Sequence, residues 1–341
     1  MADNAPDLHA SVPPPGAESI VYPFAPPAPD ASVVEVAPGI LWLRMPMPMQ
    51  LDHINIYLLR DGSGEDAGWY IVDTGLNTPA CKALWEEVVA TRLDGLPLKG
   101  LVCTHFHYDH AGLARWLTDR YAIPLWMTHG EFFTMRALGE RLPEPAPEGL
   151  VLFHQRAGMP EERIARMLAG LRKDPFMPPQ PESFRRLRAG DRLEIGGRRW
   201  QIVVGEGHSP EHACLYCAED AILIAGDQLL PRITSNVLVS SMEPEGNPLQ
   251  LWLDSLERLD RLSPDTLVLP SHERVFRGLR PRVAELQAHH RHQFDLLLAA
   301  LAGGVRLSAF EAMEVLFLRK LKAAEEMMAV GESLAHLAWL R

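Results

Sequence analysis

The residues best suited to chemistry in this chain stand close together, between positions 105 and 110. Three histidines and an aspartate follow the spacing H-x-H-x-D-H: His105, His107, Asp109 and His110. Imidazole nitrogens and carboxylate oxygens together suit zinc, iron or manganese, whereas calcium prefers oxygen ligands alone. Surface histidines on a polar loop are the simpler alternative, but this density of ligand-type side chains favours a metal site.

A strand and a helix are predicted on either side of this cluster. Residues 99–103 form a short apolar run that is typical of a buried strand. Residues 113–120 place Leu113, Trp116 and Leu117 on one face of a helix. A loop that packed elements hold at both ends can bring several ligands to one point. The spacing therefore predicts a metal-binding loop between a strand and a helix.

Three further candidate ligands come from distant parts of the chain. Each follows an apolar run that is typical of a strand, as a site at one edge of the sheets requires. A cluster such as the one at 105–110 needs partners of this kind to complete its coordination. The three residues are His208, Asp227 and His272.

The order of these motifs resembles that of the metallo-β-lactamase-fold hydrolase superfamily. H-x-H-x-D-H is followed by Gly-His, Gly-Asp and a final histidine, and an aspartate-containing turn precedes them at residues 72–75. The resemblance covers roughly residues 33 to 275. It implies an α/β fold, an αββα sandwich of two mixed β-sheets, with a glyoxalase II-like or thioesterase-like activity.

The resemblance also implies a dinuclear site with two Zn²⁺ ions, for which iron or manganese are alternatives. Two such cations lower the pKa of a shared water and supply hydroxide at neutral pH. The chain is therefore expected to be a zinc-dependent hydrolase of a carbonyl ester or thioester, with Asp109 and Asp227 as catalytic residues. The implied ligands are His105, His107 and His208 for one ion, Asp109, His110 and His272 for the other, and Asp227 as the bridge.

Four other residues are expected behind the ligands or along the pocket. Asp73 is expected either to orient a ligand histidine or only to shape its turn. His212 is expected either behind the ligands or as a packed residue. His53 and His154 are weaker candidates for lining the pocket.

The ligand set narrows the class of reaction. True zinc β-lactamases lack the bridging carboxylate that Asp227 matches, and flavodiiron proteins carry a glutamate where this chain has His107. The alternatives that remain are a lactonase, a phosphodiesterase or ribonuclease, an iron-dependent persulfide dioxygenase and a non-catalytic metal-binding scaffold. A net charge of −11 disfavours nucleic-acid binding by the whole chain, so a small-molecule ester or thioester is the expected partner.

Composition predicts three segments. Residues 1–32 are rich in proline and predict a flexible N-terminal arm, expected to lie against the body or a partner subunit. The α/β domain is expected at 33–276. Within the α/β domain, residues 130–190 form an insertion that interrupts the α/β pattern and contains many phenylalanines and methionines. They predict a helical lid that binds an apolar group, or else a packing or dimer contact. Residues 277–341 predict a helical, winged-helix-like C-terminal extension that ends before the wing hairpin.

Helical periodicity in this extension predicts several separate helices. The first, at 279–301, is expected to place His289, His290 and His292 on a solvated face. A Ser308–Glu311 capping box predicts the start of the next. Later helices are expected at about 309–316, 319–330 and 333–339.

The start of the chain and its hydropathy predict a cytoplasmic protein without membrane contact. No basic segment followed by an apolar core is visible at the N-terminus. No apolar run approaches the roughly 18 residues of a membrane-spanning helix. A homodimer is compatible with the sequence but not required by it.

Overall fold

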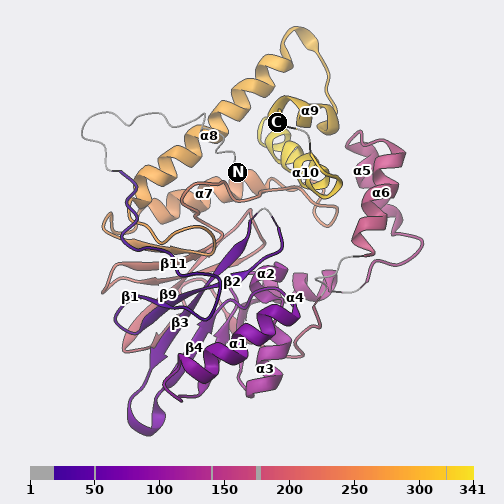
Figure 1. Ribbon diagram of the computed structural model, residues 1–341. Coiled ribbons are helices and arrows are strands. Elements are labelled where there is room, and N and C mark those ends of the chain that lie inside the picture. The colour runs from indigo at the N-terminus through magenta and orange to yellow at the C-terminus, as the bar shows by residue number, and fades with distance from the viewer. Residues whose placement is uncertain (1–18, 50, 140, 174–177, 320) are drawn as a thin grey trace, which may run out of the picture.

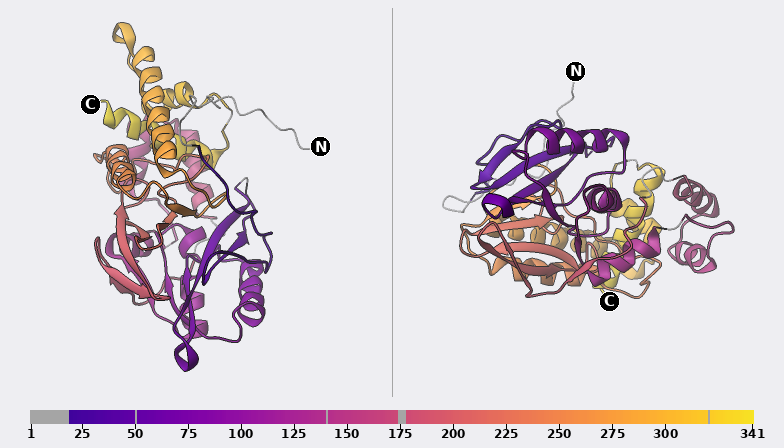
Figure 2. Two further views of the ribbon diagram at one scale, coloured as in Figure 1. Left: turned by 90° about the vertical axis from the view of Figure 1, so that its left-hand side faces the viewer. Right: turned by 90° about the horizontal axis from the view of Figure 1, so that it is seen from below.

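The computed structural model describes residues 19–341 except residues 50, 140, 174–177 and 320. Two β-sheets lie face to face in its core, and helices cover the outer face of each (Figure 1). Viewed from below, the strands of the two sheets form separate layers (Figure 2). The predicted αββα sandwich of two mixed sheets is confirmed.

The first sheet has seven strands in the order β1-β2-β3-β4-β5-β6-β7. Strands β1 to β4 pair antiparallel, and β4 to β7 pair parallel. Their bounds are Val34–Ala37 (β1), Ile40–Pro46 (β2), His53–Asp61 (β3), Gly68–Val72 (β4), Leu98–Val102 (β5), Leu125–Thr128 (β6) and Arg185–Leu187 (β7).

The second sheet has five strands in the order β12-β11-β10-β9-β8. Strands β11 and β12 pair parallel, and the other neighbours pair antiparallel. Their bounds are Arg192–Ile195 (β8), Arg198–Gly205 (β9), His212–Cys217 (β10), Ile222–Gly226 (β11) and Leu267–Pro270 (β12).

The side chains of each strand alternate between two apolar layers because successive residues point to opposite faces of a sheet. Leu101 of β5 packs under the helices of the first sheet, whereas its neighbour Val102 packs between the two sheets. Burying one such side chain contributes about 1.5–3 kcal/mol. Four helices lie beside the first sheet and two beside the second: α1 (Pro79–Thr91), α2 (Tyr108–Ala111), α3 (Ala114–Tyr121) and α4 (His129–Leu138), then α7 (Pro248–Asp260) and α8 (Leu279–Ala300).

The remaining helices form a separate group at one end of the sandwich (Figure 1). Met159 and Met167 of the predicted lid pack against Met313 and Val330 of the C-terminal extension. Within the described residues, the packing alternative therefore accounts for these two methionines. The helices of this group are α5 (Glu148–Arg156), α6 (Glu161–Leu171), α9 (Ala309–Leu316) and α10 (Ala323–Trp339), and short 3₁₀ turns occur at Gly64–Asp66 and Ala302–Gly304.

The C-terminal helices confirm one prediction and correct two. Ser308 and Glu311 form the predicted capping box of α9. The two helices predicted after residue 319 are one helix, α10. A side chain at Gly331, inside α10, would lie 2.9 Å from Leu238, so this glycine lets the loop before α7 approach closely. His290 does not lie on a solvated face but is buried against α10.

The second half of the predicted N-terminal arm lies against the body of the protein. Val21 pairs with Arg277, and Ala31 is buried in the core under the first sheet. The Arg92 side chain donates to the Ala31 carbonyl at 2.7 Å. Residues 19–32 thus lie against the body, one of the two placements expected for the arm, and residues 1–18 lie outside the described residues. Over the described part of the chain, no helix is both long and apolar enough to cross a membrane.

Candidate metal centre

All seven candidate ligands follow strand ends at one edge of the two sheets. The H-x-H-x-D-H segment follows β5, with His105 and His107 in the predicted loop but Asp109 and His110 in the short helix α2, and Asp227 directly follows β11. His208 and His272 come within three residues of the ends of β9 and β12. Because β5 runs parallel to its neighbours and β9, β11 and β12 share one direction, these loops meet at one edge. The topology therefore brings together residues that are far apart in the sequence.

Two glycines give the loops the close approach that they need. Gly207, with φ +94°, precedes His208, and a side chain there would lie 2.5 Å from Trp252 of α7. Gly226, with φ +54°, precedes Asp227, and a side chain there would lie 2.4 Å from the His212 ring. Both backbone conformations favour glycine. The Gly-His and Gly-Asp pairs in the sequence therefore have a steric cause.

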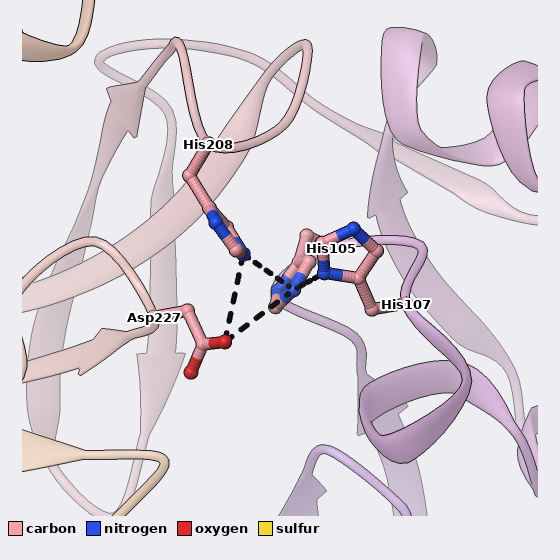
Figure 3. Close-up of side chains that lie close together, drawn as sticks. All are labelled: His105, His107, His208 and Asp227. Carbon is pink, nitrogen blue, oxygen red and sulfur yellow. Dashed lines mark hydrogen bonds and ion pairs between the residues drawn. The ribbon is translucent and has the colours of Figure 1, made fainter. Parts of the chain in front are cut away.

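The first group of candidate ligands consists of His105, His107, His208 and Asp227 (Figure 3). One ligand atom from each lies within 4.8 Å of all the others. His105 Nε2 lies 2.9 Å from His107 Nδ1 and 3.2 Å from His208 Nε2. Asp227 Oδ2 lies 3.5 Å from His208 Nε2. Three nitrogens and one oxygen thus lie close enough together to hold one metal ion.

The second group consists of Asp109, His110 and His272, whose ligand atoms also lie within 4.8 Å of one another. His272 Nε2 lies 3.4 Å from Asp109 Oδ2 and 3.3 Å from Asp227 Oδ1. Asp227 Oδ2 lies 3.5 Å from His208 Nε2 of the first group and also 3.5 Å from His110 Nε2 of the second, whereas Oδ1 faces His272. Asp227 is thus placed between the two groups.

Hydrogen bonds on the other ring nitrogens leave Nε2 free on His208 and His272. His208 Nδ1 donates to the Asn236 carbonyl at 2.8 Å, and His272 Nδ1 donates to the His53 carbonyl at 3.0 Å. A carbonyl can only accept, so the hydrogen of each neutral ring resides on Nδ1. Nε2 then presents a lone pair to the centre, which is the usual arrangement of metal-binding histidines.

Asp73 lies behind the second group. Its Oδ2 accepts from His110 Nδ1 at 2.8 Å and from the Thr104 hydroxyl at 2.9 Å. Its Oδ1 accepts the Thr104 backbone N–H at 2.8 Å. Asp73 itself adopts the left-handed conformation, with φ 65°. Of the two alternatives for this residue, the contacts favour the orientation of a ligand histidine.

Buried polar atoms at the centre fit a bound cation. Within the described residues, His110 Nε2 and Asp227 Oδ1 are buried without a hydrogen-bond partner. Leaving such atoms unpaired costs about 1–3 kcal/mol each. Both are electron-pair donors that point into the cluster, and the set as a whole combines the imidazole and carboxylate ligands that zinc, iron and manganese accept. The residues present therefore suit a divalent metal.

The electrostatics of the cluster favour the same conclusion. Burial lowers the pKa of His105 well below its ordinary value and that of His107 to about 3, so these rings keep their lone pairs. Burial also acts to lower the pKa of His110 and His272, but the carboxylates outweigh it. Asp227 and Asp109 raise the pKa of His272 to about 10. Without a cation these two rings take protons, whereas a divalent cation can neutralise the carboxylates in their place.

The three other predicted histidines have different surroundings. His53 Nε2 accepts the Glu273 backbone N–H at 3.0 Å, and its carbonyl holds His272, so it lies directly behind a candidate ligand. His212 Nε2 accepts the Asp227 backbone N–H at 3.1 Å, and its ring stacks on His105. His154 lies in α5, where its Nδ1 donates to the Leu150 carbonyl, and it belongs to neither ligand group.

Two residues near the centre were not among the predicted ones. Thr104 precedes the histidine cluster and joins Asp73 to the ligand loop. Glu131 belongs to the first turn of α4, where acidic residues are common, so its sequence context gives no signal of its contacts with the ligand loops. Only the structure shows that both are buried beside the site.

Comparison with known proteins agrees with a metal site built on this fold. The profile of the Metallo-beta-lactamase superfamily matches residues 49–272. The crystal structure of a beta-lactamase domain protein from Burkholderia ambifaria is 42% identical, with a TM-score of 0.86, and the match covers 94% of this chain and 92% of that one. This similarity extends beyond the residues that the family profile matches.

Two curated proteins are similar at lower identity. A probable metallo-hydrolase of Bacillus subtilis (strain 168) is 24% identical over 252 residues, which are 68% of this chain and 71% of that protein. A hydroxyacylglutathione hydrolase of Synechococcus is 27% identical over 231 residues, which are 66% of each chain. The match thus spans about two thirds of the length of the hydroxyacylglutathione hydrolase.

Proposed function

Because this chain belongs to the metallo-beta-lactamase superfamily, we propose that it is a dinuclear zinc hydrolase of carboxylic esters or thioesters. The observation that carries the proposal is the position of Asp227, whose carboxylate lies within 3.5 Å of ligand nitrogens from both groups. Zinc accepts such imidazole and carboxylate ligands, and its catalytic sites leave a position open for water or substrate. Iron and manganese are the alternatives that metal analysis would distinguish.

Each candidate ligand has a role in this proposal. His105, His107 and His208 would hold one ion, and Asp109, His110 and His272 would hold the other. Asp227 would be a ligand of both. When bound, two divalent cations supply Lewis acidity and a water of lowered pKa, which is what hydrolysis at neutral pH needs.

The remaining residues keep the ligands in position. Asp73 and the His53 carbonyl each accept a hydrogen from a ligand histidine, which fixes the tautomer and the ring orientation. His212 accepts the backbone N–H of Asp227 and so orients the bridging carboxylate. No serine or cysteine nucleophile is required, and the cysteine nearest the ligand loop, Cys103, is buried with its pKa raised well above the usual value by burial.

A carbonyl substrate is favoured over a phosphodiester for two reasons. The curated relatives include hydroxyacylglutathione hydrolases, which by name act on a thioester of glutathione. The net charge of −11 repels a polyanion such as RNA. The alternative substrates are a lactone and a phosphodiester. Oxidation of a persulfide is a weaker alternative than either.

A substrate panel on zinc-loaded protein tests the proposal. Acyl thioesters of glutathione and coenzyme A should be hydrolysed faster than lactones or bis-p-nitrophenyl phosphate, and metal analysis should approach two zinc ions per chain. Faster turnover of the phosphodiester would overturn the substrate class. A chain that takes up no metal after incubation with zinc would overturn the dinuclear site itself.

A further inference from the structure

The Glu131 carboxylate makes three hydrogen bonds to two separate loops. Its Oε2 accepts the Phe106 backbone N–H at 3.0 Å. Its Oε1 accepts the Ser209 hydroxyl and the Glu211 backbone N–H, both at 2.7 Å. Glu131 is fully buried at the start of α4. One carboxylate from outside the ligand motifs therefore joins two distant segments of the chain.

These two segments carry the histidines of the first ligand group. Phe106 lies between His105 and His107, and Ser209 directly follows His208. Figure 3 shows that His208 approaches His105 and His107 from a separate loop. Glu131 thus joins the two loops whose relative position sets the spacing of the three rings, although its three hydrogen bonds go to none of these rings.

The contact between α4 and the second loop is reciprocal. The Glu211 carboxylate accepts the Gly130 backbone N–H at 2.7 Å, and the Glu211 carbonyl accepts the Thr128 hydroxyl at 2.7 Å. A side chain at Gly130 would lie 3.0 Å from Glu211, so the approach leaves little free space. The first turn of α4 and the loop after β9 are therefore fixed relative to each other.

A purely packing role does not account for a carboxylate at this place. Burial raises the pKa of Glu131 to about 7, even though its three donors act in the opposite direction. An apolar side chain would fill the same volume without this electrostatic cost. The carboxylate is instead matched by donors from both loops, which is what a residue that fixes their relative position requires.

We propose that Glu131 is a positioning residue that holds the His105–His107 loop against the His208 loop and thereby preserves the spacing of the first metal-binding group. The inference rests on the proposed dinuclear site and adds to it a residue that lies outside the ligand motifs. Glu131 acts through the backbone of Phe106 and through Ser209, not by contact with metal or substrate.

Glu131→Gln is the sharpest test because it keeps the volume and changes one acceptor into a donor. In one orientation the new amide group faces the Phe106 N–H, and in the other it faces Ser209 and Glu211, so a donor meets a donor in both. In a chelator competition with zinc chloride, Glu131→Gln should bind zinc about 10- to 100-fold more weakly than the unaltered protein. This is the usual effect of losing a residue that orients metal ligands. The same titration in a His272→Ala background, in which the second group lacks one ligand, measures the zinc affinity of the first group.

Glu332→Gln is the matched control, since Glu332 of α10 is a carboxylate whose pKa burial raises to about 7. It should bind zinc as the unaltered protein does. Ser209→Ala, which leaves two of the three hydrogen bonds, should give a smaller loss of affinity and serves if Glu131→Gln does not fold.

The outcomes separate this inference from the proposed function. Unaltered zinc affinity in Glu131→Gln, or in Ser209→Ala where Glu131→Gln does not fold, would overturn the positioning role, and so would a loss of thermal stability alone. If the unaltered protein binds no zinc, the proposed dinuclear site itself is wrong. Weaker zinc binding in Glu131→Gln but not in Glu332→Gln supports the inference.

Discussion

His110 donates its Nδ1 hydrogen to Asp73 at 2.8 Å, and the same carboxylate accepts the backbone N–H of Thr104 at 2.8 Å. One side chain therefore fixes both the direction of a candidate ligand and the start of the ligand loop. This relationship joins the turn after β4 to the loop after β5, which are neighbouring strands of one sheet.

We predict that Asp73→Asn weakens zinc binding at the second group about 10- to 100-fold and lowers turnover with it. Asparagine also tolerates the left-handed conformation that residue 73 adopts, so the backbone should keep its course. Stepwise zinc titration measures the effect. Asp119→Asn, which alters an exposed carboxylate on α3, is the control. Equal zinc affinity in both variants would contradict the role of Asp73.

Asp227→Ala should abolish hydrolysis while the protein stays folded. Loss of the bridge removes Lewis-acid stabilisation worth several kcal/mol, which corresponds to a fall in kcat/KM on the order of 10³-fold or more. Circular dichroism checks the fold and elemental analysis counts the metals. His110→Ala should weaken mainly the second ion. Near-normal turnover by Asp227→Ala with both metals bound would remove the bridging assignment.

The sequence predicts the ligand edge well because each ligand follows a recognisable strand. The apolar runs before Asp227 and His272 indicate β11 and β12 because they are short and bounded by turn residues, which is typical of buried strands. The local pattern of residue types does not reveal contacts between segments that are far apart in the chain. The helices expected at 319–330 and 333–339 are one helix, and the glycine between them, Gly331, is explained by the loop that packs on it. Glu131 was not predicted at the site, and His290 was expected on a solvated face, because their partners lie far away in the chain.

Met159→Ala should destabilise the fold without changing substrate preference. Met159 is buried in a cluster that includes Met313 and Val330 of the C-terminal helices, so truncation leaves a cavity and costs about 2–5 kcal/mol. Phe133→Ala is the comparison, because Phe133 is 51% exposed and its loss should change stability by only about 0.5 kcal/mol. Urea unfolding and an acyl-chain series measure the two properties. A changed chain-length preference in Met159→Ala would restore this residue to the substrate pocket.

The contact between α8 and α10 should weaken in acid because two buried imidazoles share a hydrogen bond. His336 Nδ1 donates to the Glu332 carbonyl at 2.8 Å, which leaves its Nε2 to accept from His290 Nδ1 at 3.0 Å. Both rings are thus neutral. Burial lowers the pKa of His336 from 6.5 to about 4. Burial and the nearby His336 ring lower the pKa of His290 from 6.5 to about 3.

A lowered pKa in the folded state means that the unfolded chain binds protons first. The stability that these two rings contribute is therefore complete above pH 6.5 and is lost as the pH falls towards 4 and 3. We predict a loss of about 1–2 kcal/mol per ring between pH 7 and pH 5. The double variant His290→Leu/His336→Leu should lack this loss. The pKa of Glu332, which burial raises to about 7, acts in the opposite direction, but Glu332 is present in both proteins and cancels in their difference. Urea unfolding of the two proteins at each pH gives that difference, and parallel pH profiles would show that the imidazole pair does not titrate on unfolding.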